Sequence, residues 1–595
     1  MEKYNSREEV PEKYKWDLKE YFKDEKDFND NFSKAVDGVK SLNKYVSCTK
    51  DVNKLHEFLV KDLEMASSVL NLYAYAYLIN DQNLGVAKSM DRKAKTEKLY
   101  ADYSTAISFF EPELLKLSSD EYNSLFKDKR MDEYKSLLDR IYRNKEHILS
   151  ESEEIIINEL KSSMNHFDDI SSTMLNQEHD YGTVEVDGNK EVITSTNYRR
   201  LMKNPNREFR KEIRDKFSKV LSQYSVTSAQ LLDSYVKMNV AEYKIRKYKS
   251  CFDSKLFSYN MPISVFDTLV NTVEKNNTAY HNYLKLFKKV HNLDELYPYD
   301  LNLDFAKSDK EYTIEEAQEL CLEAVKPLGQ KYLNHFKRVF DNHYIDYAQY
   351  KGKCSGGYSF ATYDKDTRIL MSYNGDLDSV STIIHEGGHN VNHQFINEYN
   401  PIQYRDASSI VAEVTSLTNE CLLSSYLANS GKTKEEKLSG IGNIIDVINA
   451  NLFGAVREGH MEQEFYAYVE NGGTITNDYM NELTKKYIDS LHGGVVKDDD
   501  YTYLSWIRRS HYYMFFYLYS YAICISVASY IASEILSGNK DVLDKYIKFL
   551  SIGNDVWPMD AFKVLDIDLT KPEVYEKAIK YYEDLLNKFE EVYNS

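Results

Sequence analysis

The hydrophobic residues along most of this chain are spaced as in amphipathic α-helices. In the first 180 residues apolar positions return every three or four residues, as over 52–63, 65–110 and 134–142. That period places them on one face of a helix. The stretch from residue 197 to 248 and the C-terminal region show the same spacing. The pattern therefore predicts a mainly α-helical protein.

Two short stretches alternate like β-strands instead. Residues 183–194, TVEVDGNKEVIT, alternate around Asp187-Gly188, which predicts a β-hairpin. Further on, Ser355 to Tyr358 and residues 368–373 flank a turn at 364–366, which predicts short strands. We place a domain boundary at residue 195, between an N-terminal helical region over 1–195 that ends in the hairpin and a second region over 196–595.

Composition supports the helical prediction and excludes some partners. Gly (22) and Pro (9) are both scarce in 595 residues, which argues against a loop-rich β protein. The 75 basic and 94 acidic residues give a net charge of −19, which repels nucleic acid and anionic lipid. The 6 Cys lack paired spacing, so we expect no disulfide framework and no cysteine metal site. No secretory signal pattern stands at the start, so we expect a cytoplasmic protein, and no obligate protein partner is evident.

Residues 510–533 contain no charged side chain and are long enough to cross a bilayer. The segment holds six tyrosines and several serines, however. A lipid-facing helix would rarely place so many hydroxyl groups at its centre. We therefore predict a buried helix that lines a wet cavity, with a membrane span as the alternative.

The clearest chemical motif is His385-Glu386-Gly387-Gly388-His389, an H-E-x-x-H pattern. Residues i and i+4 of a helix share a face, so the two imidazoles can bind one zinc ion. Zinc lowers the pKa of water from about 15.7 to about 7, and Glu386 can then take its proton. The alternative is an ordinary helix whose histidines face solvent or fill a core. Two glycines cost a helix about 1 kcal/mol each, which favours a site that another backbone or a ligand approaches closely.

A helical pattern over 406–426 offers the third zinc ligand. Four apolar residues lie at core spacing there, namely Ile410, Val414, Leu417 and Cys421. Glu413 follows His389 by 24 residues, which leaves room for a turn and an antiparallel return. Glu420, two helical turns further on, can hydrogen-bond a zinc ligand from behind. Three protein ligands and one open position form a catalytic site; the alternative is a pair of solvated glutamates.

These two segments resemble the oligoendopeptidase F branch of the thimet oligopeptidase family of zinc metallopeptidases. His385, Glu386, Gly388 and His389 match the family's first zinc helix, and Ala412-Glu413-Val414-Thr415-Ser416 matches the second, whose Glu completes the metal site. Where the family often has a further His, this chain has Asn392, with His393 next to it. The resemblance implies a large helical body with a deep substrate channel, a small β element beside the zinc helix, and one Zn²⁺ per chain. It also implies cleavage of short unfolded peptides.

The glycine-rich segment before the zinc helix is a candidate for substrate binding. Ser355, Gly356, Gly357 and Tyr358 provide a strand edge that can pair with an extended peptide through main-chain hydrogen bonds. The glycines would let the substrate backbone come close, and the family has a similar segment beside its cleft. The alternative is a structural hairpin that caps the helix.

The aromatic segment 506–519 carries candidate donors for the negative charge that builds on the scissile carbonyl oxygen. Neutral Tyr O–H or His N–H groups can stabilise that charge. In a continuous helix Tyr512 and Tyr519 would share a face, with His511 beside them. The resemblance favours Tyr519, then His511, then Tyr512 or Tyr513. Packing in a core is the alternative for each tyrosine.

The sequence therefore predicts a zinc-dependent endopeptidase that hydrolyses internal bonds of short, unstructured oligopeptides, with Glu386 as the base. One alternative is a non-catalytic helical peptide-binding protein. The other is a zinc exopeptidase, which would need a charged anchor for a peptide terminus that we do not identify in the sequence.

Overall fold

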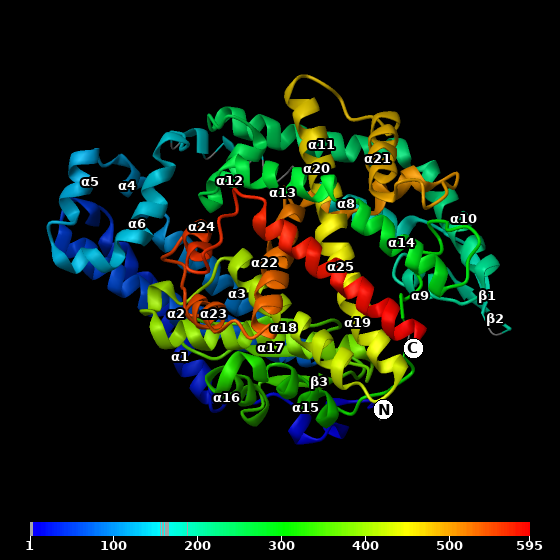
Figure 1. Cartoon of the computed structure of the whole chain (residues 1–595). Helices are drawn as coiled ribbons and strands as arrows, with labels where there is room; N and C mark the ends of the chain where they lie inside the picture. The colour runs from blue at the N-terminus through cyan, green and yellow to red at the C-terminus, as the bar shows by residue number, and fades with distance from the viewer. Residues whose placement is uncertain are drawn as a thin grey trace. The chain divides into compact units, whose positions relative to one another are not determined.

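Helices make up most of the chain in the computed structural model, as their hydrophobic spacing predicts (Figure 1). The structure describes residues 4–595 except 151, 155, 158–159, 161–165, 187 and 307. Contacts divide the chain into two interleaved units, one of residues 1–146, 309–426 and 534–566 and the other of 147–308, 427–533 and 567–595. The mainly α fold class is confirmed, whereas the boundary at residue 195 and the substrate channel stay predictions.

The first unit has an apolar core between its N-terminal helices. Phe58, Leu72 and Leu78 of α2 are fully buried there, where each large apolar side chain contributes about 1.5–3 kcal/mol. The helices of this unit are α1 (Glu25–Ser41), α2 (Val52–Gln82), α3 (Ala87–Ile107), α4 (Phe110–Lys116), α5 (Ser119–Leu125), α6 (Lys135–Tyr142), α15 (Ile314–Ala324), α16 (Gly329–Asp341), α17 (Leu377–Tyr399), most of α18 (Ser409–Ser430), α23 (Lys540–Phe549) and α24 (Pro558–Lys563).

A three-stranded sheet in the first unit contacts α17. Its strands are β3 (Ile345–Ala348), β4 (Tyr358–Phe360) and β5 (Arg368–Tyr373), in the order β3-β5-β4. β3 is parallel to β5, and β4 is antiparallel to it with Ser359 opposite Ile369. The predicted strands are present, but the first begins at Tyr358 rather than Ser355. β4 is an edge strand, and among the described residues no strand pairs with its other side.

A buried lysine anchors the loop that leads into β4. Lys353 Nζ is fully buried, lies 2.7 Å from Asp346 Oδ1, and donates to the carbonyl oxygens of Ala348 (2.8 Å) and Met371 (2.9 Å). Burial lowers the pKa of Lys353, although Asp346 opposes that shift. Because a buried charge is stable only when paired and hydrogen-bonded, these contacts fix the loop that carries the glycine-rich segment.

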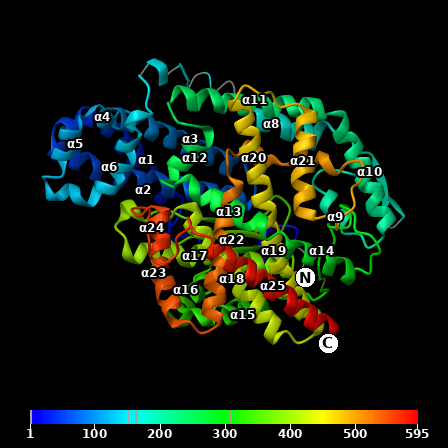
Figure 2. The same ribbon diagram turned by 45° about the horizontal axis from the view of Figure 1, so that its top comes forward.

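In the part of the second unit that the structure describes, helices predominate (Figure 2), and its strands form one hairpin. β1 (Thr183–Val186) and β2 (Asn189–Val192) pair antiparallel, as predicted, and Gly188 of the turn has a φ of +77°; Asp187 of the predicted turn lies outside the described residues. The helices of this unit are α8 (Phe167–Thr173), α9 (Tyr198–Met202), α10 (Arg207–Gln223), α11 (Ser225–Ile245), α12 (Cys251–Tyr259), α13 (Ile263–Lys275), α14 (Thr278–Val290), α19 (Lys434–Ile448), α20 (Ala455–Glu470), α21 (Asn477–His492), most of α22 (Leu518–Leu536) and α25 (Glu573–Asn594).

The uncharged segment 510–533 is not one helix. A short 3₁₀ helix, Ser510–Tyr513, ends before Phe515 and Phe516, whose φ angles are +36° and +51°, and α22 begins only at Leu518. A left-handed backbone cannot continue a right-handed helix, so the prediction of a helix from residue 510 is wrong. α22 is long and apolar enough to span a membrane, but 72% of its apolar window is buried inside the protein, which is typical of a core helix.

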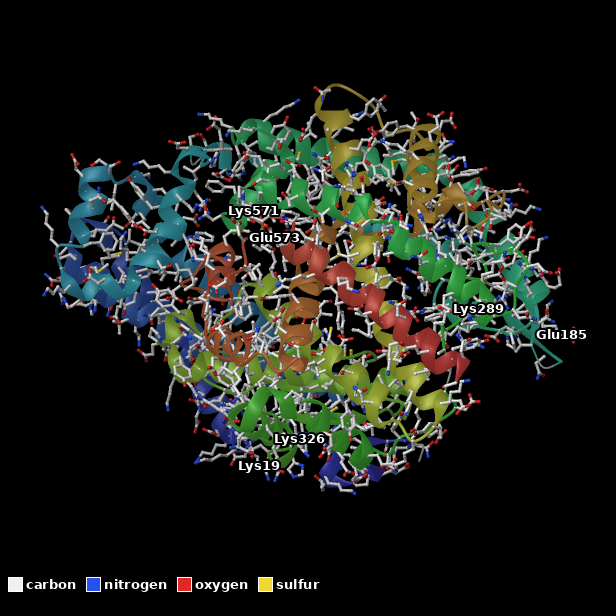
Figure 3. All side chains as sticks on the ribbon, viewed as in Figure 1. Lys19, Glu185, Lys289, Lys326, Lys571 and Glu573 are labelled. Carbon is white, nitrogen blue, oxygen red and sulfur yellow. The ribbon has the colours of Figure 1, made fainter. Side chains whose placement is uncertain are left out.

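Charged side chains such as Lys19 and Lys326 project from the ribbon (Figure 3). Many of them form exposed ion pairs, as in the contact of 2.7 Å between Lys289 and Glu590, whose side chains are 49% and 46% exposed. A pair of this kind contributes about 0–1 kcal/mol. The stability of each unit therefore comes mainly from its apolar core.

Candidate functional site

The structure brings together the three side chains that the sequence nominates as metal ligands. One ligand atom from each of His385, His389 and Glu413 lies within 4.8 Å of the other two. His385 Nε2 is 3.7 Å from Glu413 Oε2, and His389 Nε2 is 3.9 Å from Glu413 Oε1. All three side chains are half-buried. The group therefore combines two imidazole nitrogens with a carboxylate oxygen at a place that a small ion can reach.

This donor set fits a zinc ion. Zinc–nitrogen and zinc–oxygen bonds of about 2.0–2.2 Å separate tetrahedral ligands by about 3.3–3.5 Å. The histidine–glutamate distances of 3.7 and 3.9 Å exceed that range by only a few tenths of an ångström. The ligand atoms of the two histidines lie within 4.8 Å of each other, so side-chain rotations that bring all three atoms together would complete the set. His385, His389 and Glu413 can therefore hold one divalent cation with a coordination position left over.

Glu420 orients the first histidine. Its Oε1 lies 2.6 Å from His385 Nδ1, and its Oε2 accepts a hydrogen bond of 3.3 Å from Ser381 Oγ. A partner on Nδ1 leaves Nε2 of the same ring to face Glu413. Burial opposes a charge on His385, but the hydrogen bond to Glu420 and the nearby carboxylates outweigh it and raise the pKa of His385 to about 9. Burial lowers the pKa of His389, as does the neighbouring His385.

Close packing of α17 against α18 sets this geometry. Asp376 caps α17 by accepting a hydrogen bond of 2.8 Å from the Ser379 N–H. A Cβ added to Gly388 would lie 2.9 Å from Ser416 Cα on α18, and one added to Gly387 would lie 2.6 Å from the Phe336 ring. The glycines that the sequence marks as unusual therefore admit a neighbouring helix backbone and an aromatic ring.

Glu386 lies on α17 next to His385, and a serine of the sheet contacts it. The Ser359 hydroxyl donates to Glu386 Oε2, and its distance to the Glu386 carbonyl oxygen is 3.4 Å. Sequence reasoning missed Ser359, because no local spacing links a strand residue to a helix 27 positions later. The only signal is its place directly after the glycine-rich segment.

His393, which follows the position where related sequences often carry a further histidine, stabilises the fold. His393 is buried, and its Nε2 is 2.9 Å from the Thr362 carbonyl oxygen and 3.2 Å from that of Lys365. Asn392 is also buried and donates to the Leu550 carbonyl oxygen at 2.8 Å. The two residues therefore hold loops of the first unit, and neither belongs to the group of three ligands.

The glycine-rich segment is accessible at the edge of the sheet. Ser355, Gly356 and Gly357 are exposed, and Tyr358 is half-buried. Gly356 has a φ of +96° with open space where a Cβ would stand, and its N–H donates to Ser372 Oγ at 3.2 Å. The Tyr358 hydroxyl donates to Asp81 Oδ2 at 2.7 Å. The segment is thus fixed at both ends and open between them.

The aromatic candidates of the second unit separate into two groups. Tyr512 and Tyr519 are buried, and Tyr519 packs edge-on against Phe252 with its ring centre 5.5 Å away. His511 and Tyr513 are half-buried. Because the helix is broken between them, Tyr512 and Tyr519 do not share a helix face. Both are buried within their unit, and their role as donors to a substrate stays a prediction.

Two further tyrosines that we did not single out lie near His511. The His511 ring centre is 6.4 Å from those of Tyr517 and Tyr521, which are 5.1 Å from each other. All three side chains are half-buried. The strained turn at Phe515 and Phe516 lies between them, with the Phe516 N–H donating to the buried Glu462 at 2.8 Å. Such backbone strain is concentrated at functional sites.

Comparisons with known proteins agree with the motifs. The sequence profile of peptidase family M3 matches residues 200–581, and that of the oligopeptidase F N-terminal region matches residues 113–180. The chain is 30% identical to oligopeptidase PepF of Bacillus subtilis over 98% of this chain and 88% of the relative. It is 28% identical to group B oligopeptidase PepB of Streptococcus agalactiae over 98% of each protein.

Solved structures share the fold. A Chlamydophila abortus structure superposes with a TM-score of 0.92 at 24% identity, covering 99% of this chain and 100% of that one. Oligoendopeptidase F from Enterococcus faecium superposes with a TM-score of 0.73 at 24% identity, covering 96% and 99%. The family resemblance expected from the two zinc-helix motifs is confirmed. The chain is a peptidase and belongs to peptidase family M3.

Proposed function

We propose that this peptidase is a zinc-dependent endopeptidase that hydrolyses internal bonds of short, unstructured oligopeptides. The observation that carries the proposal is the convergence of His385, His389 and Glu413 within 4.8 Å, with Glu386 on the helix of the two histidines. The names of the relatives, oligopeptidase and oligoendopeptidase, support the size class of the substrate. We propose one zinc ion per chain.

The residues of the site have distinct proposed roles. His385, His389 and Glu413 would hold the zinc ion, which would supply a Lewis acid that lowers the pKa of water and polarises the scissile carbonyl. Glu386 takes a proton from the attacking water and passes it to the leaving amine. Glu420 holds the His385 ring through Nδ1, and Ser359 holds the Glu386 carboxylate through its hydroxyl.

We propose that the substrate backbone pairs with the free side of β4. The exposure of Ser355, Gly356 and Gly357 and the edge position of β4 support this. Main-chain pairing needs an extended peptide and does not depend on its side chains. A peptide bound there would lie on the strand whose Ser359 contacts the proposed base. Folded proteins lack a free extended segment and would be poor substrates.

The oxyanion donors remain a proposal supported by the sequence pattern. Tyr519, His511, Tyr512 and Tyr513 are the candidates, and His511 and Tyr513 are the more exposed in their unit. Burial raises the pKa of Tyr513 to about 12, so its hydroxyl is a neutral donor at physiological pH. A cytoplasmic location is also a proposal, supported by the burial of α22.

Metal analysis and one substitution test the proposal. The purified chain should contain about one zinc per molecule, and a chelator should abolish peptide cleavage. Glu386→Gln should keep the zinc but lower kcat by about 10²–10⁴-fold, the range for loss of a general base. Glu319→Gln, on an exposed face of α15, makes the same chemical change and should cleave like the wild type.

Three results would contradict the proposal. Substantial turnover by Glu386→Gln would show that Glu386 is not the general base. A chain that contains no zinc and binds peptides without cleaving them would be a peptide-binding protein. Mapping the cut sites in a library of peptides blocked at both ends tests the position of cleavage. Internal cuts are expected, whereas cleavage that requires a free terminus would identify an exopeptidase.

A further inference from the structure

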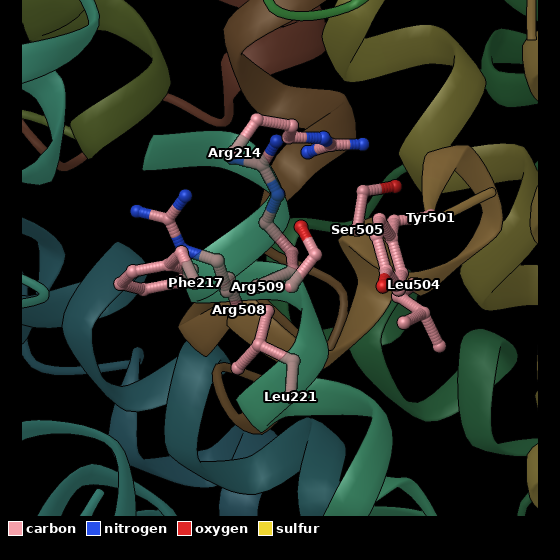
Figure 4. A pocket seen from close by; sticks show the side chains of 9 residues that line it. Arg214, Phe217, Leu221, Tyr501, Leu504, Ser505, Arg508 and Arg509 are labelled. Carbon is pink, nitrogen blue, oxygen red and sulfur yellow. The ribbon is translucent and has the colours of Figure 1, made fainter. Parts of the chain in front are cut away.

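A cavity of about 290 Å³ opens between α10 and the segment that follows Asp499, wholly within the second unit. Figure 4 shows the side chains that α10 and residues 501–509 contribute to its wall. Three of them are the arginines Arg214, Arg508 and Arg509. Three guanidinium groups around one small cavity repel one another unless anions balance them.

Two of the three arginines have carboxylate partners. Arg214 forms a two-point contact with Asp499, at 3.0 and 3.3 Å. Arg509 contacts Glu458 Oε1 at 2.5 Å, and the same oxygen also contacts Arg457. Glu458 is therefore shared between two cations. The carboxylates in contact with this cluster balance only part of its positive charge.

Arg508 has no carboxylate within ion-pair distance in the described part of the chain. Its guanidinium instead lies over two aromatic rings, 4.3 Å from the centre of Tyr198 and 4.6 Å from that of Phe217. Tyr181 stacks on the far side, with its ring centre 4.0 Å from that of Phe217. This aromatic support holds the planar donor group in place. Arg508 is exposed at the surface of the unit, so its guanidinium is accessible to a ligand that enters the cavity.

The rest of the wall is partly polar and partly apolar. Ser218, Ser505 and Tyr501 provide hydroxyl groups, and Leu221 and Leu504 provide apolar surface. A cavity of about 150 Å³ holds one benzene molecule. The volume here therefore suits a molecule about twice that size, which could contact both arginine and leucine side chains of the wall.

We propose that this cavity binds a small organic oxyanion, a carboxylate or phosphate ester that carries a short apolar group. Arg508 is its main contact, because a guanidinium presents parallel N–H groups that match the oxygens of either anion. Two sources share this chemistry: short peptides and amino acids, which end in a carboxylate, and phosphorylated metabolites. No residue of the proposed peptidase site lines the cavity.

Calorimetric titration of the full chain tests the proposal with matched probes. N-acetyl-leucine supplies the carboxylate, N-acetyl-leucinamide is its neutral counterpart, and phenyl phosphate supplies the phosphate ester. At least one of the two anions should bind tenfold or more tightly than the amide, because a hydrogen bond to a charged group contributes about 1.5–3 kcal/mol. The anion that binds more tightly identifies the source. Binding is measured without turnover, so the result does not depend on the proposed endopeptidase activity.

Two variants locate the binding. Arg508→Gln should weaken anion binding tenfold or more, whereas Arg200→Gln, which removes an exposed arginine paired with Glu191, should not. Ser505→Phe fills the cavity without changing its charge and should also abolish binding. A thermal melt of each variant establishes that it is folded. Equal affinity for anion and amide, or undiminished binding by Arg508→Gln, would overturn the proposal.

Discussion

Substituting Gly388 with alanine should loosen the candidate metal centre. An added Cβ would lie 2.9 Å from Ser416 Cα and 3.2 Å from the Thr415 carbonyl oxygen. Both are backbone atoms of α18, so the clash cannot be relieved by turning a side chain. Overpacking of this kind costs about 1–3 kcal/mol, and the better helix propensity of alanine returns about 1 kcal/mol. The difference leaves Gly388→Ala up to about 2 kcal/mol less stable than the wild type.

The same substitution should weaken metal binding. Gly388 precedes His389, and Ser416 lies one helical turn after Glu413. Moving α18 away by a few tenths of an ångström therefore widens the gap of 3.9 Å between His389 and Glu413. Sites need their ligands placed to within about 0.5 Å, so we expect zinc affinity to fall about tenfold. Competition with a chromophoric chelator measures this change.

Gly459 provides the matched control. It lies within α20, where an added Cβ would come no closer than 3.5 Å to Tyr519, an ordinary contact. Gly459→Ala should therefore gain up to about 1 kcal/mol from helix propensity and keep its zinc. Scanning calorimetry of both variants, with and without a chelator, should place the Gly388→Ala melting temperature below the wild type and Gly459→Ala at or above it. If Gly388→Ala had the same melting temperature as Gly459→Ala and bound zinc as tightly as the wild type, the close approach of α17 and α18 would be refuted.

Three further predictions follow from single contacts. Glu420→Ala should weaken zinc binding about 10–100-fold, as loss of a partner to a ligating histidine does, while the exposed control Glu319→Gln leaves it unchanged. Ser359→Ala should lower kcat by up to about tenfold with little change in KM, because it removes a hydrogen bond to the Glu386 carboxylate; Ser359→Thr should restore the rate. Burial raises the pKa of Glu462 to about 8, above the value of about 4.3 in an unfolded chain. The folded protein therefore retains a proton that the unfolded chain releases, so stability should fall as pH rises from about 4 to about 8, by up to several kcal/mol. Glu462→Gln should flatten this loss in melts recorded across that range, although Asp446, whose burial raises its pKa to about 7, leaves part of the slope.

Short-range patterns predicted the helices of the candidate site well. The i, i+4 spacing of His385 and His389 required a helix, and α17 supplies it. The apolar period over 406–426 placed Glu413 and Glu420 seven residues apart on α18. Both predictions needed only the helical repeat, because side chains of one helix keep a fixed relation to each other.

Contacts between distant segments were beyond that reasoning. Ser359 meets Glu386 only because β4 packs next to α17, and no spacing in the sequence indicates it. The break at Phe515 and Phe516 was missed for a different reason. Phenylalanine is seldom left-handed, so nothing marks these two residues as a turn. The interleaving of the two units also lacks a signal, since no Pro-, Gly- or Ser-rich stretch in the sequence marks their boundaries.

Gly387 and Gly388 lower the intrinsic stability of α17, the helix that carries the two candidate histidine ligands. Alanine at Gly387 and Gly388 would make α17 about 2 kcal/mol more stable as an isolated helix. In the folded protein, a Cβ at Gly388 would displace α18, the helix that carries Glu413. The carboxylates Glu386, Glu413 and Glu420 are also gathered around two half-buried histidines, where they repel one another. The candidate metal centre therefore combines a helix of low intrinsic stability with carboxylates that lie close together. A cation bound at the candidate metal centre would offset the repulsion between these carboxylates. The close approach of α18 that Gly388 allows would keep Glu413 within reach of that cation.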